Sequence, residues 1–465
     1  MRNLTVFVML LTLFACSKKN PKEVVFKGQI SNYTGENILL SYDGQIDTVL
    51  VGENGVFQKI LHFENNTFVF LRGDKLAGRF FLMPGYDLEF TQDVDRIDQG
   101  INFINRNVCV SVNKYLIDKY ELEDQLRMDR KEYFSMEEAE FIAKTEENYN
   151  KRSDLFTKLL EDNKKIDPVF AKEEKGSLKY SMLLNYLQYE SSHARYVKDY
   201  EFKAGEAISK KLTQEELNRS DLLNVPEYKS YLDGRLKDAA YQYYKKHSEY
   251  KEIEDGYYIA MYDQLEEWSS TPEIKSYLAA TIAEARVRWS INENSPVLKM
   301  FRKYCSDEKA LKRVNEKVAC WMRLSKGKDA FDFTGQTIEG KSMSLSDLKG
   351  KYVYVDVWAT WCGPCCGEIP YLQKIEKEYH DKNIVFLSVS VDRDIEKWKK
   401  KVNDDKLGGI QINVGQRNSI SKDYMITGIP RFMLFDKEGK IVNVNAPRPS
   451  QKEKIEKLFN SLNGL

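Results

Sequence analysis

The segment DVWATWCGPCCGEIP, from Asp356 to Pro370, holds three of the seven cysteines of this 465-residue chain within five positions. It contains the end of the apolar run KYVYVDVWA, which reads as a buried strand, and the start of a helical pattern that extends to Tyr379. A C-x-x-C pair at the start of a βαβ unit is the setting of a redox dithiol. Strand and helix patterns alternate from there to the C-terminus, which predicts an α/β domain over residues 329–465.

Three kinds of chemistry suit clustered cysteines. A structural zinc site needs four ligands, usually in two pairs, and the sequence offers no second cysteine or histidine pair for Cys362 and Cys365. A purely structural disulfide would close a very short loop and remove little entropy from the unfolded chain. A redox dithiol explains the surroundings best, because the N–H groups and dipole of the helix N-terminus stabilise a thiolate at Cys362. We therefore expect no metal, and no cofactor beyond a redox-active Cys362–Cys365 disulfide.

At this point a family resemblance becomes specific. The segment VDVWATWCGPC resembles the active site of thioredoxin, and residues 329–465 are similar to membrane-tethered thioredoxin-like proteins of the TlpA and ResA type. The resemblance implies a thioredoxin-like fold in which Cys362 attacks a disulfide and Cys365 resolves the mixed disulfide. It also implies that Asp356 and Glu368 help to move the proton of Cys365.

The same resemblance assigns a substrate-binding surface. Trp361 matches the tryptophan before the first cysteine, and Ile429-Pro430 matches a loop in which a cis proline faces the dithiol. A cis X-Pro bond is uncommon, and here it is expected to expose the backbone of Ile429 to an extended substrate strand.

Cys366 departs from the family pattern, because it directly follows the resolving cysteine. Helical geometry turns it about 100° away from Cys365, which predicts a half-buried small side chain. The alternative is a third redox thiol. Cys305 and Cys320 can pair in an oxidising compartment, and the sequence does not decide whether they do.

The N-terminus has the layout of an export signal. Residues 1–15 carry one positive charge at Arg2, an apolar run and a small residue, which predicts a secretory signal peptide. Leu13-Phe14-Ala15-Cys16 resembles the lipobox of bacterial lipoproteins, which implies that lipid is attached to Cys16. The alternative is an ordinary signal peptide followed by an incidental cysteine. The residues after Cys16 lack the acidic cluster of surface-exported lipoproteins, so a periplasm-facing membrane lipoprotein of the cell envelope is expected.

Two further regions precede the α/β domain. Short alternating runs over residues 16–105 predict an all-β domain, a small sandwich or barrel, with a hairpin turn at Glu53-Asn54-Gly55. Helical periodicity over residues 106–325 predicts a central α-helical domain, in which Thr271 and Pro272 begin one helix. Its dense tyrosines favour helix–helix seams, although a groove for an unfolded client or a glycan is the alternative. The fold class is therefore multidomain.

Composition narrows the function. Lys+Arg and Asp+Glu both total 71, so no basic excess is available for nucleic acid. The sequence predicts a membrane-anchored thiol-disulfide oxidoreductase that reduces client proteins and is recharged by a transmembrane electron donor. The alternatives are a disulfide isomerase or oxidase, and an envelope binding lipoprotein in which the redox domain is auxiliary. A peroxidase is disfavoured by the C-x-x-C, Asp356 and Ile429-Pro430.

Overall fold

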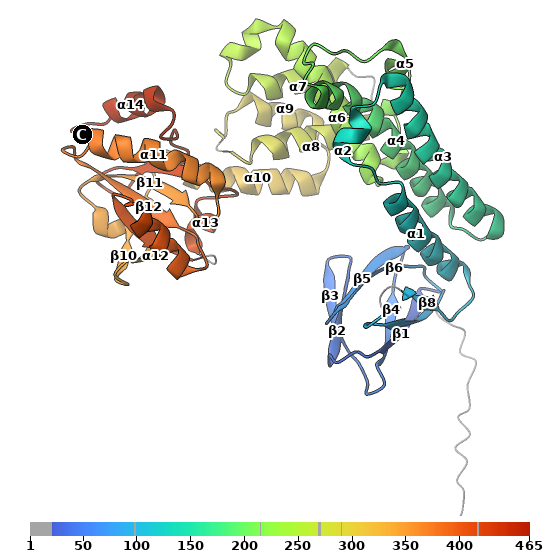
Figure 1. Cartoon of the computed structure of the whole chain (residues 1–465). Helices are drawn as coiled ribbons and strands as arrows, with labels where there is room; N and C mark the ends of the chain where they lie inside the picture. The colour runs from blue at the N-terminus through green and yellow to red at the C-terminus, as the bar shows by residue number, and fades with distance from the viewer. Residues whose placement is uncertain (1–20, 97–98, 214, 268–270, 290, 416–417) are drawn as a thin grey trace, which may run out of the picture. The chain divides into compact units, whose positions relative to one another are not determined.

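The computed structural model describes residues 21–96, 99–213, 215–267, 271–289, 291–415 and 418–465. The predicted signal peptide and Cys16 lie outside the described residues. Strands β1–β8 come first in the chain, helices α1–α10 follow, and an α/β region completes it (Figure 1). The predicted fold class is thus confirmed. The chain divides into two compact units between Tyr231 and Leu232, inside the region predicted to be one helical domain.

The N-terminal strands form two four-stranded sheets, in the orders β4-β1-β7-β8 and β3-β2-β5-β6. The strands are β1 (Glu23–Ser31), β2 (Asn37–Tyr42), β3 (Gln45–Leu50), β4 (Val56–His62), β5 (Thr67–Gly73), β6 (Leu76–Leu82), β7 (Leu88–Asp93) and β8 (Asn102–Phe103).

Aromatic rings from both sheets build the core between them. Phe26 of β1 lies 5.1 Å from Phe80 of β6, and Phe80 lies 4.7 Å from Phe90 of β7, measured between ring centroids. Gly28 faces Phe57 and Phe90 on the neighbouring strands, and a Cβ at Gly28 would collide with both rings. The strand alternation predicted from sequence therefore produces a sandwich with an aromatic interior.

The Glu53-Asn54-Gly55 turn forms, and Gly55 has a φ of 71°. Its interpretation as a hairpin is wrong, because β3 pairs with β2 whereas β4 pairs with β1 in the other sheet. A local turn signal predicts a reversal of the chain but not the partner of the strand that follows it.

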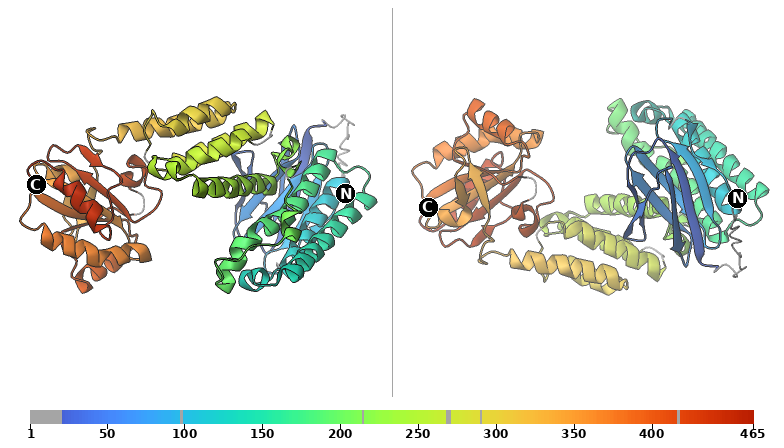
Figure 2. Two further views of the ribbon diagram at one scale, coloured as in Figure 1. Left: turned by 90° about the horizontal axis from the view of Figure 1, so that it is seen from above. Right: turned by 90° about the horizontal axis from the view of Figure 1, so that it is seen from below.

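The helices are α1 (Val108–Gln125), α2 (Arg130–Phe134), α3 (Glu138–Asp162), α4 (Pro168–Val197), α5 (Glu206–Ser209), α6 (Pro226–Lys246), α7 (Gly256–Glu267), α8 (Pro272–Arg286), α9 (Pro296–Tyr304) and α10 (Glu308–Arg323). Side chains of α1, α3 and α4 join the core of the sandwich, and both views in Figure 2 show these helices against the blue strands. Asn113 of α1 fixes this contact, because its amide bonds both the N–H and the carbonyl of Phe81 at 2.9 and 2.7 Å.

The predicted start of one helix at Thr271 is observed, and several tyrosines of the helical region are buried where helices meet. The Thr271 side chain caps α8 by accepting from the N–H of Ile274. Tyr180, Tyr228 and Tyr231 are fully buried, with Tyr180 and Tyr228 4.6 Å apart between centroids. These three rings therefore pack together where α4 meets the start of α6.

The C-terminal domain is a seven-stranded sheet in the order β10-β9-β13-β12-β11-β14-β15. Its strands are β9 (Thr334–Thr337), β10 (Ser342–Ser344), β11 (Tyr352–Trp358), β12 (Ile384–Ser390), β13 (Ile410–Asn413), β14 (Arg431–Phe435) and β15 (Ile441–Asn443). Its helices are α11 (Gly363–Glu378), α12 (Ile395–Asp404), α13 (Ser419–Asp423) and α14 (Lys452–Asn460).

Strand β11 runs through the middle of this sheet, parallel to β12 and antiparallel to β14. All seven of its residues are buried, as expected for a strand covered on both faces. Helices α11 and α14 lie side by side over the sheet (Figure 1), and their apolar faces meet Tyr354 of β11. The chain leaves this strand at Trp358 and enters α11 five residues later, at Gly363.

Candidate active site

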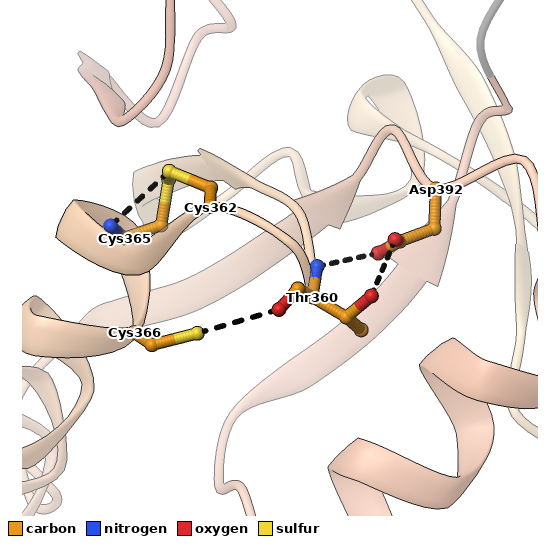
Figure 3. The surroundings of a disulfide bond; sticks show 5 residues. All are labelled: Thr360, Cys362, Cys365, Cys366 and Asp392. Carbon is orange, nitrogen blue, oxygen red and sulfur yellow. Dashed lines mark hydrogen bonds between the residues drawn. A yellow bond between two sulfur atoms is a disulfide. The ribbon is translucent and has the colours of Figure 1, made fainter.

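Cys362 and Cys365 form a disulfide at the N-terminus of α11, with their Cα atoms 5.2 Å apart. Cys362 is the N-cap residue, and its sulfur accepts a hydrogen bond from the Cys365 N–H at 3.2 Å (Figure 3). Pro364 stands in the first turn, where its missing N–H costs no helical hydrogen bond. Both sulfur-bearing side chains are buried in the described structure.

A buried carboxylate holds the loop that leads to the dithiol. Asp392 accepts hydrogen bonds from the Thr360 N–H at 2.9 Å and from the Thr360 hydroxyl at 2.7 Å (Figure 3). The Ser390 hydroxyl donates to the same carboxylate at 2.8 Å. Three donors offset the cost of burying this carboxylate. Asp392, which follows β12, therefore holds the loop before Cys362 in place.

Cys366 points away from the disulfide (Figure 3), as its place in the helix predicts. It is half-buried, and its thiol lies 3.7 Å from the carbonyl oxygen of Thr360. Cys305 and Cys320, whose pairing the sequence left open, are both free thiols, as are Cys109 and Cys366.

Asp356 lies on β11, two residues before the strand ends at Trp358. Burial, together with the negative charges of Glu368 and Glu376, raises the pKa of Asp356 to about 8. One of its oxygens, Oδ1, has no hydrogen-bond partner among the described residues. A carboxyl group in this environment is protonated at neutral pH and can serve as a proton donor.

Glu368 is buried on α11, and its carboxylate is held by one residue far along the chain. The N–H and the hydroxyl of Ser450 each donate to it at 2.9 Å. These two hydrogen bonds tie α11 to the segment before α14, and the negative charge of Glu368 contributes to the raised pKa of Asp356.

The three predicted substrate-binding residues lie near the dithiol to different extents. Ile429 is partly buried and packs against the cluster that contains Cys362 and Cys365. The Ile429–Pro430 peptide bond is cis, as the sequence predicts. Trp361 is 71% exposed beside Cys362, so it offers an apolar surface to solvent.

Sequence reasoning missed Asp392, Ser450 and Glu376. Asp392 and Ser450 reach the site through contacts that join distant segments, and no local spacing identifies them. Glu376 did carry a signal, because it stands four residues after Leu372 on the face of α11 that packs inward. Burial raises the pKa of Glu376 to about 7.

The structure tests metals and membrane spans only for the residues it describes. Within those ranges, no group of three or more His, Cys, Asp or Glu side chains is arranged to hold a metal ion. Over the same residues, no helix combines the length and apolar character needed to cross a bilayer.

Comparison with known proteins places this site in a family. The family model described as Redoxin matches residues 325–462. The thiol-disulfide oxidoreductase ResA of Bacillus thuringiensis (strain Al Hakam) is 35% identical over 121 residues, which are 26% of this chain and 69% of the relative. The thioredoxin-like protein YneN of Bacillus subtilis (strain 168) is 32% identical over 136 residues, 29% of this chain and 79% of the relative.

A solved structure of the thioredoxin domain of a thiol-disulfide oxidoreductase from Bacteroides vulgatus is 36% identical in sequence to this chain. The match covers 30% of this chain and 99% of the solved chain, with a TM-score of 0.28. The sequence matches define the C-terminal region as a thioredoxin-like redoxin domain with thiol-disulfide oxidoreductase activity. The chain belongs to the TlpA/ResA-type family of thiol-disulfide oxidoreductases.

Proposed function

We propose that the chain reduces disulfide bonds of client proteins on the periplasmic side of a membrane, where a lipid on Cys16 anchors it. The observation that carries the proposal is a Cys-Gly-Pro-Cys disulfide at a helix N-terminus, preceded by a strand that carries the buried acid Asp356. The Gly363-Pro364 spacer supports the reducing direction, because it resembles the spacer of reducing thioredoxin-like proteins.

The client half-reaction begins with the Cys362 thiolate, which attacks one sulfur of the client disulfide. A Cys362–client bond forms, the client S–S bond breaks, and the second client sulfur leaves as a thiolate. Asp356 as carboxylate takes the proton of Cys365, and the Cys365 thiolate then attacks the Cys362 sulfur. The intramolecular disulfide forms, the client leaves, and two electrons have passed from the dithiol to the client.

Re-reduction of the Cys362–Cys365 disulfide by a donor dithiol reverses these steps. A donor thiolate attacks Cys362, the Cys362–Cys365 bond breaks, and Cys365 leaves as a thiolate that takes the proton of Asp356. A second donor thiolate then releases Cys362, so the donor supplies both electrons. In this scheme Glu368 acts through its charge, which raises the pKa of Asp356 in the disulfide form. A transmembrane electron carrier is the proposed donor.

Trp361 and the loop at Ile429 and Pro430 form the proposed client surface. Trp361 is exposed, and Ile429 packs beside the dithiol, so an extended client segment can contact both. The backbone of Ile429 would pair with this segment as an added strand.

The reduction potential of Cys362–Cys365 tests the direction of electron flow. We expect a value near the roughly −270 mV of thioredoxin, or lower, after equilibration with defined ratios of reduced and oxidised thiol buffer. A value between about −120 and −180 mV would instead place the chain with oxidases and isomerases and overturn the reductase proposal.

Two variants test the client and the anchor. Cys365→Ser retains the attacking cysteine but cannot resolve the mixed disulfide, so it is expected to accumulate client adducts that reducing agent releases. Cys16→Ala is expected to move the chain from the membrane to the soluble fraction of the cell envelope. Adducts absent from Cys365→Ser, or membrane retention of Cys16→Ala, would each contradict the corresponding part of the proposal.

A further inference from the structure

A small, partly enclosed cavity lies under the active-site helix. Its volume is about 10 Å³, close to the minimum that holds one buried water. Strands β11, β12 and β13 form its floor, α11 covers it, and the segment that follows α12 closes one side. Its polar lining is Asp356, Trp358, Gln373, Glu376, Ser388 and Gln411.

Strand register brings the floor of this cavity together. Asp356 of β11 stands beside Ser388 of β12, and Ser388 stands beside Gln411 of β13, so the three form one row across the sheet. The Gln411 Nε2 group donates to the carbonyl oxygen of Gly408 at 2.7 Å, which leaves its Oε1 atom for the cavity.

Three buried polar atoms of this lining have no hydrogen-bond partner among the described residues. They are Oδ1 of Asp356, Oε1 of Gln411 and Nε1 of Trp358. Leaving each atom unsatisfied costs about 1–3 kcal/mol, so a partner is expected. When Asp356 carries its proton, one water can accept from the Asp356 O–H and from the indole N–H and donate to Gln411 Oε1, which satisfies all three groups and leaves its second hydrogen for Glu376.

Glu376 connects this cavity with the surface. It is half-buried, whereas Asp356 is buried, and both carboxyl groups line the cavity. Its carboxylate lies against Gly408, where an added Cβ would collide with it. Glu376 is three turns along α11 from Cys365, about 16 Å along the helix axis, and therefore far from the proposed client surface.

We propose that Glu376 and one internal water form a proton relay that links Asp356 with solvent while a client covers the dithiol. When Asp356 unloads, its carboxyl O–H bond breaks, the water receives that proton, and the water passes another proton to the Glu376 carboxylate. Glu376 then releases the proton to bulk water, and the internal water is unchanged. The inference rests on the proposed role of Asp356 as the group that moves the proton of Cys365.

The charges around the relay favour this exchange. The titratable groups that face Asp356 are Glu368 and Glu376 from α11 and Tyr354 from its own strand, while the neighbouring residue of β12 is the uncharged Ser388. Burial raises the pKa of Glu376 to about 7, next to the value of about 8 for Asp356. Proton transfer between groups of similar pKa has little thermodynamic barrier in either direction.

The test compares Glu376→Gln with Glu378→Gln in the full chain. Glu378 lies on the same helix and pairs with Lys452 at the surface, so it controls for the loss of a negative charge from α11. Infrared titration of the carboxyl groups follows Asp356, and stopped-flow reaction with a disulfide-linked fluorescent peptide at pH 5.5–9 follows the dithiol. Asp356→Asn provides the reference for loss of the acid itself.

We expect Glu376→Gln to lower the pKa of Asp356, because it removes a neighbouring negative charge, and to slow the peptide reaction about tenfold, against roughly 100-fold for Asp356→Asn. Gly408→Ala, which crowds the Glu376 carboxylate without removing it, should slow the reaction in the same direction. Glu378→Gln should change neither quantity.

If Asp356→Asn alters the pH profile but Glu376→Gln behaves like Glu378→Gln, the relay is overturned and the role of Asp356 stands. If Asp356→Asn leaves the profile unchanged, both the role of Asp356 and the relay fail. Glu376→Gln is nearly isosteric, and a retained Cys362–Cys365 potential would show that the active site is intact.

Discussion

The N-terminal sandwich and the C-terminal redoxin domain fill their interiors in opposite ways. Among the described residues of β1–β8, Thr67 is the one buried polar side chain, and rings such as Phe26 and Phe90 fill the space. The redoxin domain, a single sheet covered by helices, buries Asp356 and Asp392. Burying a carboxyl group costs free energy that burying a phenyl ring does not. Hydrogen bonds from Thr360 and Ser390 offset this cost at Asp392, and at Asp356 the cost appears as a raised pKa.

The largest expected difference between the regions concerns catalysis. Cys362→Ser should lower the reduction of a model disulfide such as that of insulin at least about 1,000-fold, because no other side chain supplies the attacking sulfur. Circular dichroism should show an unchanged fold. Retention of the biological function by this variant would favour the alternative in which the chain is a binding lipoprotein with an auxiliary redox domain.

A substitution in the sandwich should separate stability from chemistry. Phe26→Ala removes a fully buried ring and should lower the free energy of unfolding of the first unit by about 3–5 kcal/mol. Hydrogen exchange of β1 and β7 measures this loss locally, and disulfide reduction at low temperature should stay unchanged. A matching loss of activity would show that the two regions depend on each other.

Asp356→Asn should have the opposite effect on stability. The pKa of Asp356 in the folded disulfide form, about 8, lies above the unfolded value of about 3.9. The folded state therefore retains a proton that the unfolded state loses, and stability falls as the pH rises from about 4 to 8.

Replacing Asp356 by a neutral amide removes this decline. The oxidised variant should gain on the order of 2–4 kcal/mol over the natural chain at pH 8, and little near pH 4. Guanidinium unfolding followed by the fluorescence of Trp358 and Trp361 measures both values. An equal effect at the two pH values would show that the pKa of Asp356 does not rise on folding.

The smallest expected effect belongs to Cys366→Ser. The Cys366 thiol points to the Thr360 carbonyl and away from the disulfide, so its loss should change the rate of disulfide reduction less than about twofold. A change in rate above about tenfold, or a Cys366 adduct found by mass spectrometry during turnover, would support the alternative in which Cys366 is a third redox thiol.

Local sequence patterns predict some of the features that distinguish the two domains. The position of Cys362 before a helix follows from the apolar run of β11 and from Pro364, and the apolar–polar alternation of the short runs over residues 16–105 predicts a small sandwich or barrel. The row of polar residues Asp356, Ser388 and Gln411 could not be predicted from sequence. It depends on the register of three strands that are separated in the chain by α11 and α12. The contact between Glu368 and Ser450 spans 82 residues, and single-chain patterns contain no record of such pairs.

The central place of β11 also has a consequence for biosynthesis. Its antiparallel neighbour, β14, is made only after the helix that carries the cysteines, and the Ser450 that holds Glu368 comes later still. A chain emerging from its N-terminus therefore exposes Cys362 and Cys365 before their flanking strand and anchoring hydroxyl exist. Until β14 and Ser450 have been made, the surroundings that hold the active-site helix in the folded domain are incomplete.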